Sequence, residues 1–302
     1  MLSPTGKGPT DALVDSAYRA LREAPTERPP EWPTEGSELV WYPPLATFLN
    51  NCVGACRGAL DGSKSATAND PRSRLYDHLK FIVYDRTTVD GVEGASQVKP
   101  DLVGGLDLES TDRVAWAPQD SHTKRVLFPV EVEGGWGQLV SQAATYARCL
   151  FSASPSRQFA VVLGFQHRDG ELRFLVFHRG GLTGSKHLSV KGESGQRDIL
   201  RILLSILNWR SAKDAGFPEF YNELEMRLLR HEDDQVGVVA SVLEVLHDDL
   251  CVQGRASRVL RMGYPTSEGK EPDHPISAPG PAFRTRGRAR IETKQTRMPF
   301  HH

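Results

Sequence analysis

The sequence has almost no excess of charge of either sign. Lys and Arg number 37 against 38 for Asp and Glu, which leaves a formal net charge of -1 at neutral pH. Without a net electrostatic field, the chain has no general attraction to nucleic acid or to an anionic membrane. Any affinity of that kind must therefore come from a local patch.

Long apolar runs are also missing. No run approaches the roughly 20 residues that a helix needs to cross a bilayer. The first nine residues, MLSPTGKGP, lack the apolar core of a secretory signal. We therefore expect a cytoplasmic or nuclear protein without a membrane partner.

Cysteine is scarce, and its spacing argues against disulfides and cysteine-based metal sites. None of the four cysteines forms a C-x-x-C pair, and each stands in an apolar or helical context, which predicts reduced intracellular thiols. They are Cys52, Cys56, Cys149 and Cys251. With 39% hydrophobic and 25% charged residues, the chain can bury one sizeable core or two small ones.

Hydrophobic periodicity places helices and strands along the chain, and their order predicts an α/β (α+β) protein with a mixed central sheet flanked by helices. Apolar residues at helical spacing predict helices near 10–25, 45–60, 135–150 and 197–209. β-branched and aromatic runs predict strands near 78–86, 99–107, 125–133, 157–165 and 171–179, the last two forming a hairpin.

We expect four parts along the chain. They are an N-terminal helix with a proline-rich linker (1–37), a main module (38–250), a short segment (251–262) and a disordered tail (263–302). We interpret the tail as a solvated, basic segment, which could also offer a local site for nucleic acid or a nuclear signal. The arginines concerned are Arg284, Arg286, Arg288 and Arg290.

Two acidic motifs stand on neighbouring predicted strands. Lys99-Pro100-Asp101 begins one, and Glu131-x-Glu133 ends the other before a helix that carries Gln138 and Gln142. This order resembles the restriction-endonuclease-like core, whose motif is PD followed by (D/E)-x-K. The resemblance implies that Asp101 and Glu131 hold Mg²⁺ or Mn²⁺ and that the metal activates water against a phosphodiester. Residues two apart on a strand face the same side, so residue 133, at the lysine position of the motif, points at the same site as Glu131.

Glu133 departs from this pattern because it occupies the lysine position. A second carboxylate adds negative charge beside the attacking water and at best supplies a further metal ligand. The residues implied are Asp101, Glu131, Glu133 and Gln142 as a degenerate catalytic site, with Asp101 and Glu131 as metal ligands. The alternative is an ordinary solvent-exposed edge strand, because alternating V-E-V-E is common on half-exposed strands.

Residues 40–262 further resemble the region that precedes the kinase domain in fungal-type protein kinases. The resemblance rests on Lys99-Pro100-Asp101, Tyr146-Ala147-Arg148, Arg157-Gln158-Phe159 and Phe177-His178-Arg179-Gly180-Gly181, in the family's order and spacing. Gly254-Arg255 matches the start of the family's glycine loop, so residues 251–262 look like its vestige. No lysine strand, catalytic loop or D-F-G follows, and we expect no ATP site.

Two functions therefore compete. The first is a truncated member of that family, a non-catalytic accessory domain that binds a protein partner or a kinase domain. The second is a divalent-metal-dependent nuclease that uses Asp101 and Glu131. His167-Arg168-Asp169 matches the H-R-D sequence of a kinase catalytic loop, but Phe174 stands where that loop needs asparagine. This match therefore supports neither function, and we expect a hairpin turn there.

Overall fold

The computed structural model describes most of the chain up to residue 217 and three strands beyond it. Side chains are described for residues 8–23, 25–63, 74–89, 98–154, 157–178 and 180–217, and backbone alone for 225–228, 238–248 and 258–263. The chain divides into two compact units, Met1–Tyr221 and Asn222–His302. Each unit is described by itself.

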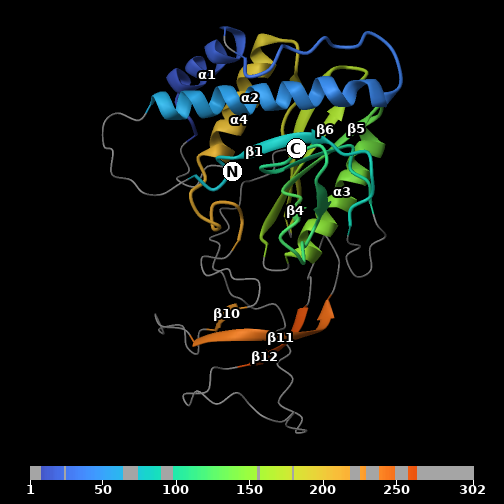
Figure 1. Ribbon diagram of the computed structural model, residues 1–302, viewed down its shortest axis with the longest axis vertical. Helices are drawn as coiled ribbons and strands as arrows, with labels where there is room; N and C mark the ends of the chain where they lie inside the picture. Colours follow the sequence, from blue (N-terminus) through green and yellow to red (C-terminus); the bar gives the residue numbers. More distant parts are fainter. Residues whose placement is uncertain are drawn as a thin grey trace, which may run out of the picture. The chain divides into compact units, whose positions relative to one another are not determined.

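The first unit contains helices and strands in mixed order (Figure 1). Its helices are α1 (Asp11–Glu23), the short η1 (Glu38–Trp41), α2 (Tyr42–Gly62), α3 (Trp136–Ala153) and α4 (Glu193–Leu207). Its strands are β1 (Leu79–Val83), β2 (Leu102–Leu106), β3 (Arg113–Ala115), β4 (Thr123–Arg125), β5 (Phe128–Glu133), β6 (Phe159–Gln166), β7 (Glu171–His178), β8 (Gly181–Gly184) and β9 (Leu188–Ser189).

One mixed sheet forms the centre of this unit. Its strand order is β1-β2-β5-β6-β7-β8, and β9 also pairs with β7. All neighbours are antiparallel except β5 and β6, which run parallel. Parallel neighbours need a crossover connection, and α3 supplies it between β5 and β6. The predicted mixed sheet flanked by helices is thus confirmed, including the pairing of the Asp101 strand with the Glu131 strand.

The two faces of the sheet are covered by different helices. Side chains of α1, α2 and α4 form one apolar core with alternate sheet residues such as Val130 and Val132. The intervening residues of β5, Glu131 and Glu133, contact α3 instead. Figure 1 shows α1, α2 and α4 gathered together, with α3 apart from them beside β5 and β6. Two-residue alternation along β5 therefore separates its apolar side chains from its acidic ones.

Close packing of α3 on the sheet depends on a glycine in β6. A Cβ built at Gly164 would overlap the Leu139 side chain of α3. Only a residue without a side chain lets this helix approach so closely, and the approach brings the α3 polar residues within reach of β5.

The predicted hairpin is present, and the sequence H-R-D lies in its turn. β6 and β7 pair from Phe159 with His178 to Gln166 with Glu171, so residues 167–170 connect them. Gly170 has a φ of +64°, which glycine adopts without strain. One predicted strand differs: residues 125–133 separate into the end of β4 and β5, with Val126 and Leu127 bonded to Ala115 and Gly104 between them.

The described residues cover only some of the four predicted parts of the chain. Helix α1 does not stand apart as part of a separate 1–37 segment, because Val14, Ala17 and Leu21 join the core with α2 and α4. In the second unit, β10 (Glu225–Leu228), β11 (Val238–Asp248) and β12 (Arg258–Gly263) form an antiparallel sheet. β12 covers the end of the predicted glycine-loop vestige. The start of that vestige, the 264–302 tail and its four arginines lie outside the described residues.

Candidate functional site

Asp101 lies directly before β2 and joins three elements. Its Oδ1 accepts a hydrogen bond of 2.5 Å from the Tyr42 hydroxyl at the start of α2. Its Oδ2 accepts the backbone N–H of Val132 in β5 at 2.8 Å. The carboxylate is therefore held by the strand that carries both glutamates and by a helix from the opposite face of the sheet.

Glu131 and Glu133 are buried and each meets a side chain of α3. Their residues are 3% and 7% exposed. Glu131 Oε2 lies 2.6 Å from the Tyr146 hydroxyl, and Gln142 Nε2 donates to Glu133 Oε1 at 2.7 Å. Because β5 lies between β2 and β6 and both glutamates are covered, the alternative of a solvent-exposed edge strand is wrong.

The Tyr146 hydroxyl lies between two acceptors, and a proton on Glu131 would let it bond to both. The Tyr146 oxygen lies 2.6 Å from Glu131 Oε2 and 3.1 Å from the Lys99 carbonyl oxygen, yet a hydroxyl has one proton to donate. If Glu131 is protonated, it donates to Tyr146, which then donates to Lys99. That arrangement satisfies all three polar groups within the protein, whereas an ionised Glu131 takes the one Tyr146 proton for itself.

Burial and neighbouring negative charges also favour the protonated form of Glu131. Burial raises the pKa of Glu131 to about 8, and the charge of Asp101 adds to the effect despite the Tyr146 hydrogen bond. Burial also raises the pKa of Asp101 to about 6, against the hydrogen bonds from Tyr42 and Val132. Burial and the charge of Glu131 raise the pKa of Tyr146 well above its ordinary range, so the phenol stays protonated. At neutral pH, Glu131 is mostly neutral and Asp101 mostly charged.

The structure brings together all four predicted site residues, and sequence reasoning missed three others. Glu38 of η1 lies 3.5 Å from the Tyr42 hydroxyl and its charge raises the pKa of Asp101. Tyr42 and Tyr146 are the other two. Tyr146 follows Gln142 by four residues and so shares its helix face, a spacing that could have identified it. Nothing in the sequence links Tyr42 with Asp101, 59 residues away.

The cluster of Asp101, Glu131 and Glu133 has donor atoms that suit Mg²⁺ or Mn²⁺, and part of their capacity is taken up by protein donors. Carboxylate oxygens suit both ions. However, Asp101 uses both its oxygens on protein donors, and Glu131 and Glu133 each use one. Among the residues with described side chains, no three His, Cys, Asp or Glu are placed to hold a metal ion. The binding of a divalent ion by Asp101 and Glu131 therefore stays a prediction from the sequence.

The described residues that donate to the carboxylates carry no positive charge. Across the described part of the chain, no Lys or Arg forms an ion pair with Asp101, Glu131 or Glu133. The donors that meet them are two tyrosines, an amide side chain and a backbone N–H, all of them neutral. Within this set of residues, protonation of Glu131 is what reduces the negative charge of the cluster.

The comparisons add no relative. No protein-family model, no curated protein and no solved structure matches the chain. Within the described residues, the chain has no helix with both the length and the apolar character needed to pass through a bilayer. The two family resemblances therefore stay predictions from the sequence.

Proposed function

We propose that the first unit is a restriction-endonuclease-like module that has lost hydrolytic activity and acts by binding a protein partner, like the region before the kinase domain in fungal-type protein kinases. The order of elements supports the fold. An antiparallel β1-β2-β5 group, the α3 crossover and a parallel β6 follow one another, with Asp101 and Glu131 on adjacent strands.

The observation that carries the loss of activity is the way this chain satisfies its own carboxylates. Phosphodiester hydrolysis needs positive charge beside the attacking water and the leaving oxygen, from a metal ion, a lysine or both. Here Glu133 occupies the lysine position and bonds to Gln142, while Glu131 bonds to Tyr146. Burial of Glu131 opposes the ionised form that a metal ligand needs, and a second glutamate does not replace the cation.

A cleavage assay with four proteins tests this proposal. Wild type, Asp101→Asn, Glu133→Lys and the control Glu23→Gln, an exposed glutamate of α1, are incubated with single- and double-stranded DNA and RNA in Mg²⁺ or Mn²⁺. We expect no cleavage by wild type, Asp101→Asn or the control. Glu133→Lys restores the missing positive charge and is the variant in which metal-dependent cleavage is expected to appear. Robust wild-type cleavage that is lost in Asp101→Asn would overturn the proposal.

One observation favours the nuclease as a second candidate. Glu131 Oε1 and Glu133 Oε2 accept no hydrogen bond from the described residues, so each acid keeps one oxygen for a ligand. If Mn²⁺ raises the melting temperature of wild type but not of Asp101→Asn, these oxygens and Asp101 bind the ion. Cleavage together with that thermal shift identifies the nuclease, and a thermal shift alone identifies a metal-binding but inactive module.

A further inference from the structure

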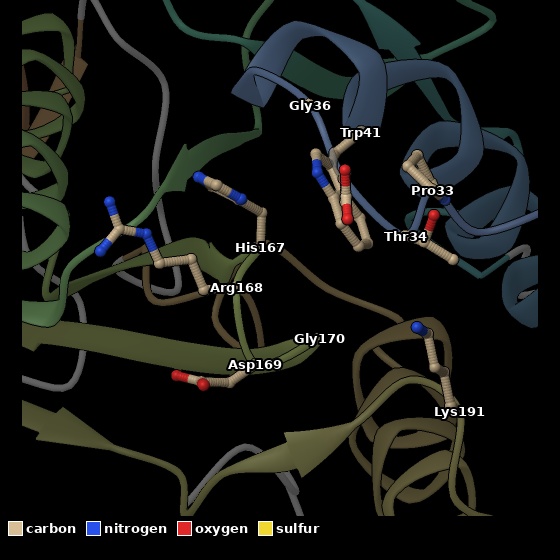
Figure 2. A pocket seen from close by; sticks show the side chains of 10 residues that line it. Pro33, Thr34, Gly36, Trp41, His167, Arg168, Asp169, Gly170 and Lys191 are labelled. Carbon is tan, nitrogen blue, oxygen red and sulfur yellow. The ribbon is translucent and has the colours of Figure 1, made fainter.

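A pocket of about 540 Å³ lies where the segment after α1 meets the β6–β7 turn (Figure 2). Small-molecule sites in proteins occupy roughly 300–1,000 Å³, so this pocket has room for a ligand of mononucleotide size. Its lining residues are Pro33, Thr34, Glu35, Gly36, Trp41, His167, Arg168, Asp169, Gly170 and Lys191. The pocket adjoins the acidic cluster, because the His167 N–H bonds to the Glu133 carbonyl at 3.1 Å.

Two residues of this pocket, Trp41 and Lys191, have donors without a hydrogen bond or an ion pair among the described residues. Trp41 is 5% exposed, and its indole Nε1 is buried without any hydrogen bond among the described atoms. A buried donor in that state costs about 1–3 kcal/mol, which an acceptor on a ligand recovers when the Trp41 ring turns to expose its N–H. Lys191 forms no ion pair with the described residues, and its Nζ lies 5.8 Å from the centre of the Trp41 ring. Figure 2 shows its side chain directed towards Trp41 and Thr34.

The acidic groups that line the pocket do not neutralise Lys191. Asp169 accepts a hydrogen bond of 2.5 Å from Gln166, and Figure 2 shows its carboxylate directed away from Lys191. Arg168 is likewise directed away from the pocket interior in Figure 2. Glu35 is exposed and makes no hydrogen bond within the described residues, so it is available to accept from hydroxyl groups.

We propose that this pocket binds a free small molecule of mononucleotide size that carries a phosphoryl group and hydroxyl groups. Lysine is a compact point charge that suits phosphate, and Lys191 takes the phosphoryl group with the Thr34 hydroxyl as a second donor. Glu35 accepts hydrogen bonds from the ligand's hydroxyls. An acceptor on the ligand satisfies the Trp41 N–H. This binding does not depend on hydrolysis at the neighbouring carboxylates.

The test uses AMP as the probe and the whole chain as the protein. Indole N–H signals are followed by ¹H–¹⁵N NMR, with the Trp41 signal assigned by its loss in Trp41→Phe, and affinities are measured by calorimetry. We expect AMP to shift the Trp41 signal, and adenosine or inorganic phosphate to bind more weakly. Lys191→Gln should weaken AMP binding about tenfold or more, whereas Lys186→Gln, an exposed lysine already paired with Asp198, should change it less than about twofold.

Three results would overturn the proposal. The first is an unchanged Trp41 signal at saturating AMP. The second is equal AMP affinity in Lys191→Gln and Lys186→Gln, which calorimetry measures even if Trp41→Phe fails to fold. The third is tighter binding of a 5′-phosphorylated single-stranded oligonucleotide than of AMP, which would assign the pocket to a nucleic-acid end.

Discussion

Replacing Glu131 by Gln should change how stability depends on pH. In the folded protein the pKa of Glu131 is raised from 4.5 to about 8, mainly by burial. The folded state therefore holds a proton that the unfolded chain releases above pH 4.5. Stability is highest at low pH, decreases as pH rises from 4.5 to about 8, and changes no further above that. Glutamine keeps the shape of the side chain and cannot ionise, so Glu131→Gln should remove this part of the dependence.

The size of the effect follows from the shift in pKa. Each pKa unit corresponds to about 1.4 kcal/mol, so a pKa near 8 sets an upper limit of roughly 4 kcal/mol between about pH 5 and about pH 9. Water entry and the coupled titration of Asp101 reduce that limit. We expect Glu131→Gln to be more stable than wild type by about 2–4 kcal/mol at about pH 9 and nearly equal to it at about pH 5.

Urea unfolding followed by tryptophan fluorescence measures this difference. All five tryptophans lie in the first unit, so the signal reports the unit that contains Glu131. Metal-free buffer keeps the carboxylates without a cation, and Glu23→Gln serves as the exposed control. Asp101, whose pKa is raised to about 6, contributes a slope of the same sign at lower pH in every variant. Equal pH dependence in wild type and Glu131→Gln would show that Glu131 is not protonated in the folded state.

Gly164 and Gly58 offer a matched pair of alanine substitutions. Gly164→Ala should destabilise the first unit by about 1–3 kcal/mol because the new Cβ overlaps Leu139, whereas Gly58→Ala in open space on α2 should be neutral or stabilising; urea unfolding distinguishes them. Asn50→Ala should cost about 1–3 kcal/mol in the same assay, because Asn50 of α2 bonds both the N–H and the carbonyl of Phe81 on edge strand β1; an unchanged midpoint would contradict this. Calorimetry and phosphate-transfer assays should detect neither tight ATP-Mg²⁺ binding nor kinase activity, because the sequence has no kinase catalytic loop or D-F-G; transfer that survives repurification would contradict this.

Local patterns determined most of the secondary structure. Helical spacing of apolar residues located α1, α2, α3 and α4, and β-branched runs located β1, β2, β5, β6 and β7. These signals are reliable because a helix or strand that buries one face repeats its apolar residues at a fixed period. The order of elements then predicted that the Asp101 strand pairs with the Glu131 strand, as it does.

Tertiary structure decided whether the side chains of the two acidic motifs are buried and which residues they contact. The alternation V-E-V-E is the same for an exposed edge strand and for a central strand covered by a helix, so the sequence left both open. Packing of α3 against Gly164 decided the matter by burying Glu131 and Glu133 beneath Tyr146 and Gln142. Tyr42 reaches Asp101 only because α2 is folded against the sheet. Protonation of a carboxylate depends on its burial and on neighbours distant along the chain, and those contacts exist only once the elements have packed.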